Sequence, residues 1–404
     1  MDNVKPYKIA VPQSEIEALN QRLRTSKIPH LFEDKWERGP PAGDIQNITK
    51  YWKDEFSWSA FENRLNQLPQ YETTIDLDGF EPFQVHFIHQ RSESKDAIPL
   101  LFVHGWPGGF WEVTKLLPIL AQSEKDGGPA FHVVAPSLPN FGFSSRIDQP
   151  GFGLRQYAET CHQLMQRLGY EQYASQGGDW GSMITLSTGA FHPEALRAIH
   201  INMIYGAPPP PTSPWAFLRF LGTHLLGLYS DREKAGLKAG ADYMERGQGY
   251  FQIQKTKPNT IGIALADSPV GLLAWIYDCL VSWTDNYEWT PQEVCEWVSL
   301  YWFSRPGPAA SVVIYHEALK GEWKTRGGIS VPGTKLGFSY FPKEVFSLPR
   351  FWNRRLGDVV FEREHDRGGH FPAWEQPELL AGDLRVMFGK GGGAYGAVQD
   401  MPRA

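Results

Sequence analysis

The stretch Gly177-Gly178-Asp179-Trp180-Gly181 decides how this chain is expected to fold. It follows a short apolar run, Tyr173 to Gln176, that predicts a strand, and it precedes a predicted helix from about Ser182. A polar side chain between small residues at a strand-to-helix turn is typical of a nucleophile elbow, because glycine tolerates the strained backbone of that turn. The alternative is an aspartate that only caps the following helix.

Aspartate at such a turn predicts a different reaction from serine. A serine nucleophile attacks an acyl carbon, whereas a carboxylate displaces a leaving group at saturated carbon and forms an alkyl ester. Epoxides and alkyl halides are the electrophiles that suit this chemistry. If the pentapeptide is an elbow, Asp179 is therefore the predicted nucleophile.

Strands and helices alternate around this stretch. Short apolar runs at Pro99 to Val103 and Phe131 to Ala135 predict buried strands, and residues 154–168 carry the apolar stripe of a helix. The alternation from about 98 to 205 indicates an α/β fold with a parallel sheet. Upstream, an Asp78-Gly79 turn between alternating runs predicts a β-hairpin.

The two flanks of this core have a helical pattern. The first 70 or so residues are amphipathic, and Ser14 to Glu17 and Ser59 to Glu62 match capping boxes. Four prolines at 208–211 interrupt the α/β pattern, and the aromatic-rich helices that follow predict an inserted lid. The predicted organisation is an N-terminal arm with first strands (1–95), a core in two parts (96–207 and 329–390), a helical lid (208–328) and a mobile tail (391–404).

Composition excludes several functions. Lysine and arginine total 39 against 45 aspartates and glutamates, a formal net charge of −6, which argues against nucleic acid as a partner. Aromatic residues make up 14% of the chain. Such an excess is typical of a thick core, a stacking surface or an apolar ligand pocket, and the acidic balance removes stacking on nucleic acid.

Cofactors, metals and membranes are not indicated either. Cys161, Cys279 and Cys295 match neither a disulfide framework nor a metal motif, and no phosphate-binding or dinucleotide loop is complete. No apolar run of about 18 residues predicts a membrane span, and the N-terminus lacks the pattern of a secretion signal. We therefore expect a cytoplasmic protein that needs no cofactor or metal.

Two further motifs suit a nucleophile elbow. The loop 104–109, His-Gly-Trp-Pro-Gly-Gly, follows the strand that ends at Val103, where α/β-hydrolases place an oxyanion loop. The backbone N–H groups of Trp106 and Trp180 would then face the oxyanion. An ordinary Gly/Pro turn is the alternative.

His370, the last histidine, follows two glycines and suits the chain order nucleophile, acid, histidine. Spacing alone does not choose its acid partner, and the candidates are Glu344, Asp358, Glu362, Glu364 and Asp366.

Taken together, these motifs resemble the microsomal-type epoxide hydrolases, in the soluble form seen in fungi, within the α/β-hydrolase superfamily. The resemblance runs from about Pro6 to Phe388. It rests on the loop at 104–108, the elbow at 177–182, a lid motif at 267–274, and the segments 337–344 and 367–371. Many members have serine or threonine where Gly109 stands, a departure that affects loop detail and leaves the backbone donors in place.

The resemblance assigns the roles that spacing leaves open. It implies Asp179 as nucleophile, His370 as base and Glu344 as the acid partner of the histidine. It also implies two lid tyrosines, Tyr250 and Tyr315, as acids that protonate the epoxide oxygen, where the residues alone suggest packing.

The resemblance also implies the activity. An apolar or aromatic epoxide and water would give a vicinal diol through an alkyl ester on Asp179, in detoxification or in the catabolism of aromatic hydrocarbons. A haloalkane dehalogenase also places tryptophan after its aspartate, but a halide leaving group needs no tyrosine acid. An epoxide-opening cyclase and a non-catalytic ligand-binding protein on the same fold would also carry many of these motifs. The sequence does not decide the physiological substrate, the selectivity of the enzyme, or whether the chain forms a homodimer.

Overall fold

A nine-stranded sheet runs through the computed structural model, which describes residues 3–31, 35–121, 128–320 and 329–399. The strand order is β1-β2-β3-β5-β4-β6-β7-β8-β9. The strands are β1 (Val4–Pro6), β2 (Gln70–Ile75), β3 (Phe83–Gln90), β4 (Ile98–Val103), β5 (Phe131–Pro136), β6 (Tyr173–Gly177), β7 (Leu196–Ile201), β8 (Val331–Tyr340) and β9 (Gly357–Glu364).

The sheet changes from antiparallel to parallel along this order. Strands β1 to β3 pair antiparallel, β3 pairs antiparallel with β5, and all pairs from β5 to β9 are parallel. The hairpin between β2 and β3 turns at Gly79, whose φ of +84° suits glycine. Leu100 and Val103 of β4 are buried, as expected of a central strand between two helical layers. The predicted α/β fold is confirmed.

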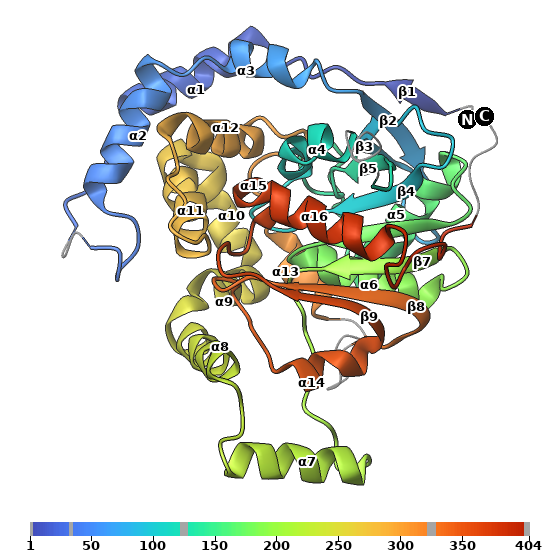
Figure 1. The fold of residues 1–404 in the computed structure, drawn as a ribbon. Helices are drawn as coiled ribbons and strands as arrows, with labels where there is room; N and C mark the ends of the chain where they lie inside the picture. The colour runs from blue at the N-terminus through green and yellow to red at the C-terminus, as the bar shows by residue number, and fades with distance from the viewer. Residues whose placement is uncertain (1–2, 32–34, 122–127, 321–328, 400–404) are drawn as a thin grey trace.

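Five helices frame the parallel part of the sheet: α4 (Leu117–Ala121), α5 (Leu154–Arg167), α6 (Trp180–Phe191), α15 (Pro372–Glu375) and α16 (Pro377–Phe388). In Figure 1, α16 crosses in front of the strands, and α4 lies beside it. Helix α5 buries a stripe that includes Tyr157, Cys161 and Leu164, and packs against α6. The described end of the chain folds back here, since the Ala394 N–H donates to the Met387 carbonyl and Ala394 is buried.

The N-terminal arm consists of α1 (Gln13–Thr25), α2 (Ala42–Asp54) and α3 (Trp58–Leu65). Figure 1 shows it stretched across the top of the molecule, where α2 packs on α12 of the lid. Both predicted capping boxes were misplaced. Helix α1 begins after Pro12, and the side chain that caps α3 is Ser57, which accepts from the Ala60 N–H.

The helical lid lies between β7 and β8, and Pro208 to Pro211 belong to neither helix nor strand. Its helices are α7 (Pro214–Leu225), α8 (Asp231–Asp242), the π-turn η2 (Tyr243–Gly247), α9 (Gly249–Thr256), α10 (Pro258–Asp267), α11 (Pro269–Ser282), α12 (Pro291–Trp302) and α13 (Val313–Ala318). The exact domain limits stay a prediction. Residues 321–328 of the predicted lid and 400–404 of the predicted tail lie outside the described residues.

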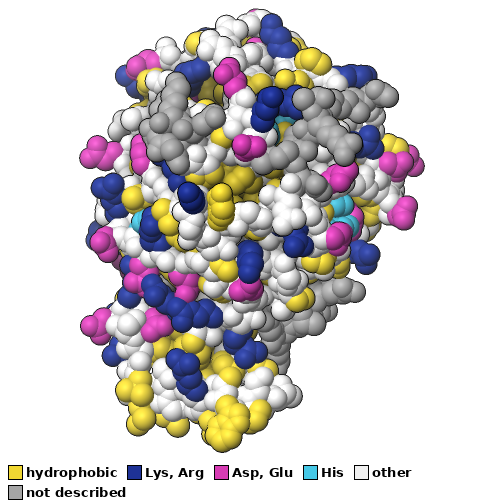
Figure 2. All heavy atoms as spheres, turned by 45° about the vertical axis from the view of Figure 1, so that its right-hand side comes forward, with side chains coloured by type: hydrophobic (Ala, Val, Ile, Leu, Met, Phe, Trp, Pro, Cys, Tyr) yellow, Lys and Arg dark blue, Asp and Glu magenta, His cyan; other side chains and the backbone are white. Residues whose placement is uncertain are grey.

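The surface carries both signs of charge. Figure 2 shows basic and acidic side chains interspersed, with hydrophobic side chains gathered at the lower end, where Figure 1 places α7. Trp215 and Leu225 of α7 are among the most exposed apolar residues. No single helix of the described residues is long and apolar enough to cross a membrane, although the bent pair α10 and α11 meets that test by length and composition.

Candidate active site

Asp179 occupies the turn between β6 and α6 with a φ of +49°, a strained value for a residue with a side chain. Neighbouring glycines are required for this turn. A Cβ at Gly181 would lie 1.9 Å from the Val103 carbonyl oxygen, and one at Gly177 would lie 2.5 Å from the Gly181 oxygen. The Asp179 side chain makes no capping hydrogen bond to α6. The geometry is therefore that of an elbow and not that of a helix cap.

The loop after β4 supplies a backbone donor to this carboxylate. The Trp106 N–H donates to Oδ1 of Asp179 at 2.8 Å. Lid side chains fix the loop, because Trp297 Nε1 donates to the Pro107 carbonyl at 2.5 Å and the Tyr301 hydroxyl donates to the Gly108 carbonyl at 2.7 Å. The donor that the sequence indicated is thus aimed at Asp179.

The second predicted donor is the backbone of Trp180. This residue is the first of α6, and N–H groups in the first turn of a helix have no intrahelical partner. That the Trp180 N–H faces an oxyanion at Asp179 stays a prediction.

His370 and Glu344 form a buried pair. Nδ1 of His370 lies 2.5 Å from Oε1 of Glu344, and the two residues are 3% and 7% exposed. Glu344 also accepts from the Val345 N–H at 2.7 Å and from Nδ2 of Asn202 at 3.3 Å. These bonds hold the carboxylate against one ring nitrogen, so that the other nitrogen is directed elsewhere.

The remaining acid candidates lie away from His370. Asp358 pairs with Lys335, Glu362 with Arg354 and Glu364 with Arg350, and Asp366 is exposed. Of the five candidates, the geometry brings only Glu344 to the histidine.

The other ring nitrogen of His370 faces Asp179, with Nε2 at 3.3 Å from Oδ2. Burial alone would lower the pKa of His370, but the carboxylates of Glu344 and Asp179 outweigh burial and raise the pKa well above its usual range. The two carboxylates therefore favour the protonated form of His370 in the resting site.

The two lid tyrosines lie over the nucleophile. Tyr250 of α9 stacks on the Trp106 ring at 5.4 Å, and Tyr315 of α13 packs edge-on against the Trp180 ring at 5.0 Å. The tyrosine rings themselves are 5.8 Å apart. Burial raises the pKa of both phenols well above 10, so both carry their proton at neutral pH.

Asp179 and both tyrosines line one cavity of about 330 Å³. Its walls are mostly apolar and include Met183, Met203, Tyr205, Phe251, Leu319 and Phe346. A cavity of this size with few polar groups suits a small apolar molecule. The predicted nucleophile and both tyrosines therefore share this cavity, and His370 and Glu344 adjoin it through the contact of His370 with Asp179.

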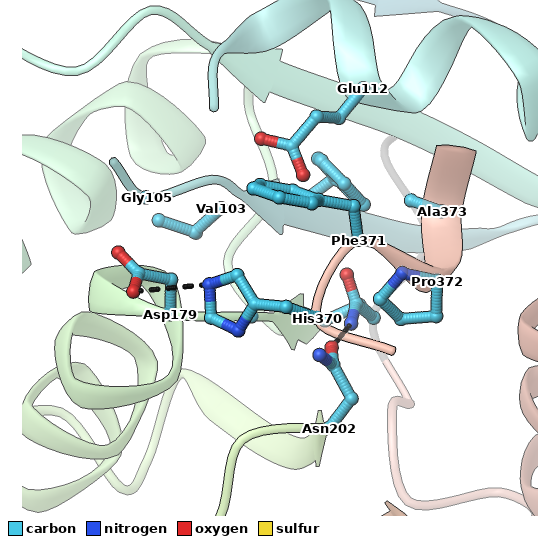
Figure 3. A pocket seen from close by; sticks show the side chains of 12 residues that line it. Val103, Gly105, Glu112, Asp179, Asn202, His370, Phe371, Pro372 and Ala373 are labelled. Carbon is cyan, nitrogen blue, oxygen red and sulfur yellow. Dashed lines mark hydrogen bonds and ion pairs between the residues drawn. The ribbon is translucent and has the colours of Figure 1, made fainter. Parts of the chain in front are cut away.

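Sequence reasoning missed two polar residues at this site. Tyr243 places its hydroxyl oxygen 2.6 Å from that of Tyr250. Glu112, which accepts from the Gly109 N–H at 2.8 Å, lines a second cavity of about 10 Å³ together with Asp179 and His370 (Figure 3). That volume is about the space of one water molecule. The only sequence signal for Glu112 is its place just beyond the loop at 104–109.

No group of three or more His, Cys, Asp or Glu side chains suited to a metal ion is present in the described parts of the chain. Cys161, Cys279 and Cys295 are buried free thiols. The titratable groups that the site brings to Asp179 thus include carboxylates, the His370 imidazole and phenols.

Comparisons with known proteins find similar sequences over most of the chain. A family model described as "Epoxide hydrolase N terminus" matches residues 4–113, and one described as "alpha/beta hydrolase fold" matches residues 98–233. Epoxide hydrolase 1 of Sus scrofa is 32% identical, and the match covers 96% of this chain and 89% of that protein.

Solved structures of epoxide hydrolases are also similar to this chain. The epoxide hydrolase of Aspergillus niger superposes with a TM-score of 0.79 at 33% identity, covering 94% of each chain. The juvenile hormone epoxide hydrolase of the silkworm Bombyx mori gives a TM-score of 0.83 at 30% identity, covering 94% of this chain and 93% of that one. Similarity of this extent spans the arm, the core and the lid together.

Proposed function

The chain belongs to the epoxide hydrolase family, with the α/β-hydrolase fold, and on this premise we propose that it converts an apolar or aromatic epoxide to a vicinal diol through a covalent ester on Asp179. The proposal is carried by one observation. A carboxylate at a strained turn, a paired histidine and two protonated tyrosines line or adjoin one apolar cavity.

In the first step, Asp179 attacks a ring carbon of the epoxide. A bond forms between the carboxylate and carbon, the ring C–O bond breaks, and a proton passes from a lid tyrosine to the released oxygen. Tyr250 and Tyr315 suit this role because buried phenols stay protonated at neutral pH and donate hydrogen bonds.

Esterification then changes the charge around His370. The ester of Asp179 is neutral, so one of the two carboxylates that raise the pKa of His370 is lost. The histidine proton can leave and restore the tyrosine, and neutral His370 becomes a base. Glu344 keeps the ring oriented throughout.

In the second step, His370 takes a proton from water as the water oxygen attacks the carbonyl carbon of the Asp179 ester. The Trp106 and Trp180 N–H groups would stabilise the resulting oxyanion. The ester bond breaks, the diol oxygen takes the proton from His370, and the acid proton of Asp179 returns to the histidine. The resting ion pair is then restored.

Isotope labelling tests the covalent route. The oxygen that joins the diol comes from Asp179, so one turnover in ¹⁸O-water, with enzyme in excess over styrene oxide, gives mostly unlabelled diol and labelled Asp179. Label in the diol of the first turnover would instead show direct attack by water. Absence of any diol from a panel of styrene-type, aliphatic and terpenoid epoxides would overturn the activity itself.

Two competing activities share parts of the site. A haloalkane dehalogenase would release chloride from haloalkanes, but its leaving group does not need Tyr250 and Tyr315. An epoxide-opening cyclase would give a cyclic ether where this proposal gives a diol. Product analysis separates all three. A role in detoxification or aromatic catabolism, a cytoplasmic location and a homodimer stay predictions.

A further inference from the structure

The two proposed acids have different surroundings. The hydroxyl oxygen of Tyr250 lies 2.6 Å from that of Tyr243, whereas the buried Tyr315 hydroxyl has no hydrogen-bond partner among the described residues. The two tyrosines that are proposed to protonate one epoxide oxygen therefore differ, because a neighbouring hydroxyl forms a hydrogen bond with only one of them.

An unusual backbone segment positions Tyr243. It is the first residue of η2, a π-turn between α8 and α9, and lies seven residues before Tyr250. A π-turn fits one more residue into a helical turn than an α-helix does, and such turns often occur at functional sites. The Tyr243 ring packs edge-on against Phe346 at 4.8 Å and lines the same cavity as Asp179.

Because each phenol has a single proton, only one direction of the hydrogen bond between Tyr243 and Tyr250 is possible during ring opening. A phenol has one proton to donate. When Tyr250 gives its proton to the epoxide oxygen, its own oxygen can only accept, so Tyr243 must be the donor. Tyr250 then carries a negative charge in a buried site, and burial, which raises its pKa well above 10, opposes that charge.

A donor aimed at a charged oxygen offsets this cost, because hydrogen bonds to ionised groups are about twice as strong as neutral ones. For Tyr315, whose pKa burial raises, the nearby donor is the Trp180 side chain, which opposes that rise, but the two groups do not meet in a hydrogen bond of normal geometry. We propose that Tyr243 is a positioning residue, which donates to Tyr250 as the epoxide opens and so makes Tyr250 the principal acid of the pair. This inference rests on the proposed function.

A Tyr243→Phe variant tests the inference, because it keeps the ring against Phe346 and removes only the hydroxyl. With enzyme in excess over styrene oxide, rapid quenching and mass spectrometry give the rates of ester formation and ester hydrolysis separately. Tyr243→Phe should slow ester formation about 10-fold, the worth of one hydrogen bond to a charged group, and leave ester hydrolysis unchanged.

A double-mutant cycle shows through which tyrosine Tyr243 acts. In a Tyr250→Phe background, Tyr243→Phe should have no further effect on ester formation. In a Tyr315→Phe background it should still cost about 10-fold. Tyr250→Phe alone should slow the step more than Tyr315→Phe alone. A Tyr243→Phe loss that persists without the Tyr250 hydroxyl would overturn the inference.

Tyr229 gives a matched control. It is another buried lid tyrosine whose hydroxyl has no partner among the described residues, and it does not line the cavity. Tyr229→Phe should leave both rates and the melting temperature unchanged. If Tyr243→Phe forms the ester at the wild-type rate, the inference fails while the proposed function stands. If the wild type forms no ester, the proposed function fails.

Discussion

The Nε2 atom of His370 lies 3.3 Å from Oδ2 of Asp179, so the proposed base faces the proposed nucleophile directly. In the resting site this contact joins a cation and an anion, because the pKa of His370 is raised. Esterification of Asp179 removes the anion and weakens the hold on the histidine proton. In the proposed reaction, formation of the ester would therefore convert His370 into the base that hydrolyses it.

The first prediction concerns this coupling. Asp179→Asn keeps the shape of the side chain but removes its charge, so the pKa of His370 should fall, while Glu344 keeps it from falling as far as burial alone would take it. Titration of the His370 ring by NMR measures the shift directly. An unchanged pKa would show that Asp179 does not hold the histidine proton.

The second prediction separates the two steps. His370→Gln should leave ester formation intact and block hydrolysis, because Asp179 and the tyrosines are untouched. One equivalent of epoxide is consumed, and the mass of the protein rises by the mass of that epoxide. Turnover should fall by about 10²- to 10⁴-fold, the usual worth of a positioned base. Loss of both ester and diol would contradict a role for His370 that begins only after the ester has formed.

The third prediction concerns the acid partner of the histidine. Glu344→Gln leaves the buried ring without a charged acceptor, so turnover should fall by at least about 10²-fold, with the larger effect on ester hydrolysis. Glu362→Gln is the matched control, since Glu362 pairs with Arg354 and not with the histidine, and it should change turnover little. Equal losses in the two variants would remove Glu344 from the proposed mechanism.

Local chemistry made the fold and the elbow predictable. The run of apolar residues that became β6, the glycines around Asp179 and the helix after it are encoded within a few neighbouring residues. The four prolines at 208–211, which predicted the start of the lid, are likewise a local signal. Helix starts were less accurate, because Pro12 and Ser57 begin α1 and α3 where later serines had the better motif.

Contacts between distant segments were not predictable from spacing. Glu344 and His370 are 26 residues apart, and three nearer acids sit on β9 and face arginine or lysine partners instead. Only the family resemblance selected Glu344. Tyr243 was missed because its contact with Tyr250 depends on a π-turn. The residue patterns considered in the sequence do not predict that turn.

The last prediction concerns Glu112, a buried carboxyl group beside the nucleophile. Burial raises the pKa of Glu112 to about 8, although the Gly109 N–H and His370 oppose the shift. Between its unfolded pKa of about 4.3 and about 8, Glu112 therefore binds a proton in the folded state but not in the unfolded state. Folding stability should fall as pH rises through this window, because the unfolded state ionises Glu112 freely while the folded state must keep its proton.

Glu112→Gln should remove that loss, since glutamine resembles the protonated acid and does not ionise. Relative to the wild type, the melting temperature of Glu112→Gln should rise between pH 5 and pH 8, and the two curves should be closest at the acid end. Glu378→Gln, at an exposed position on α16, controls for the loss of one negative charge. Its curve should run parallel to that of the wild type. If the curve of melting temperature against pH for Glu112→Gln also ran parallel to that of the wild type, the folded protein would hold ionised Glu112 without loss of stability. The carboxylate would then need a hydrogen-bond donor in the small cavity that it shares with His370.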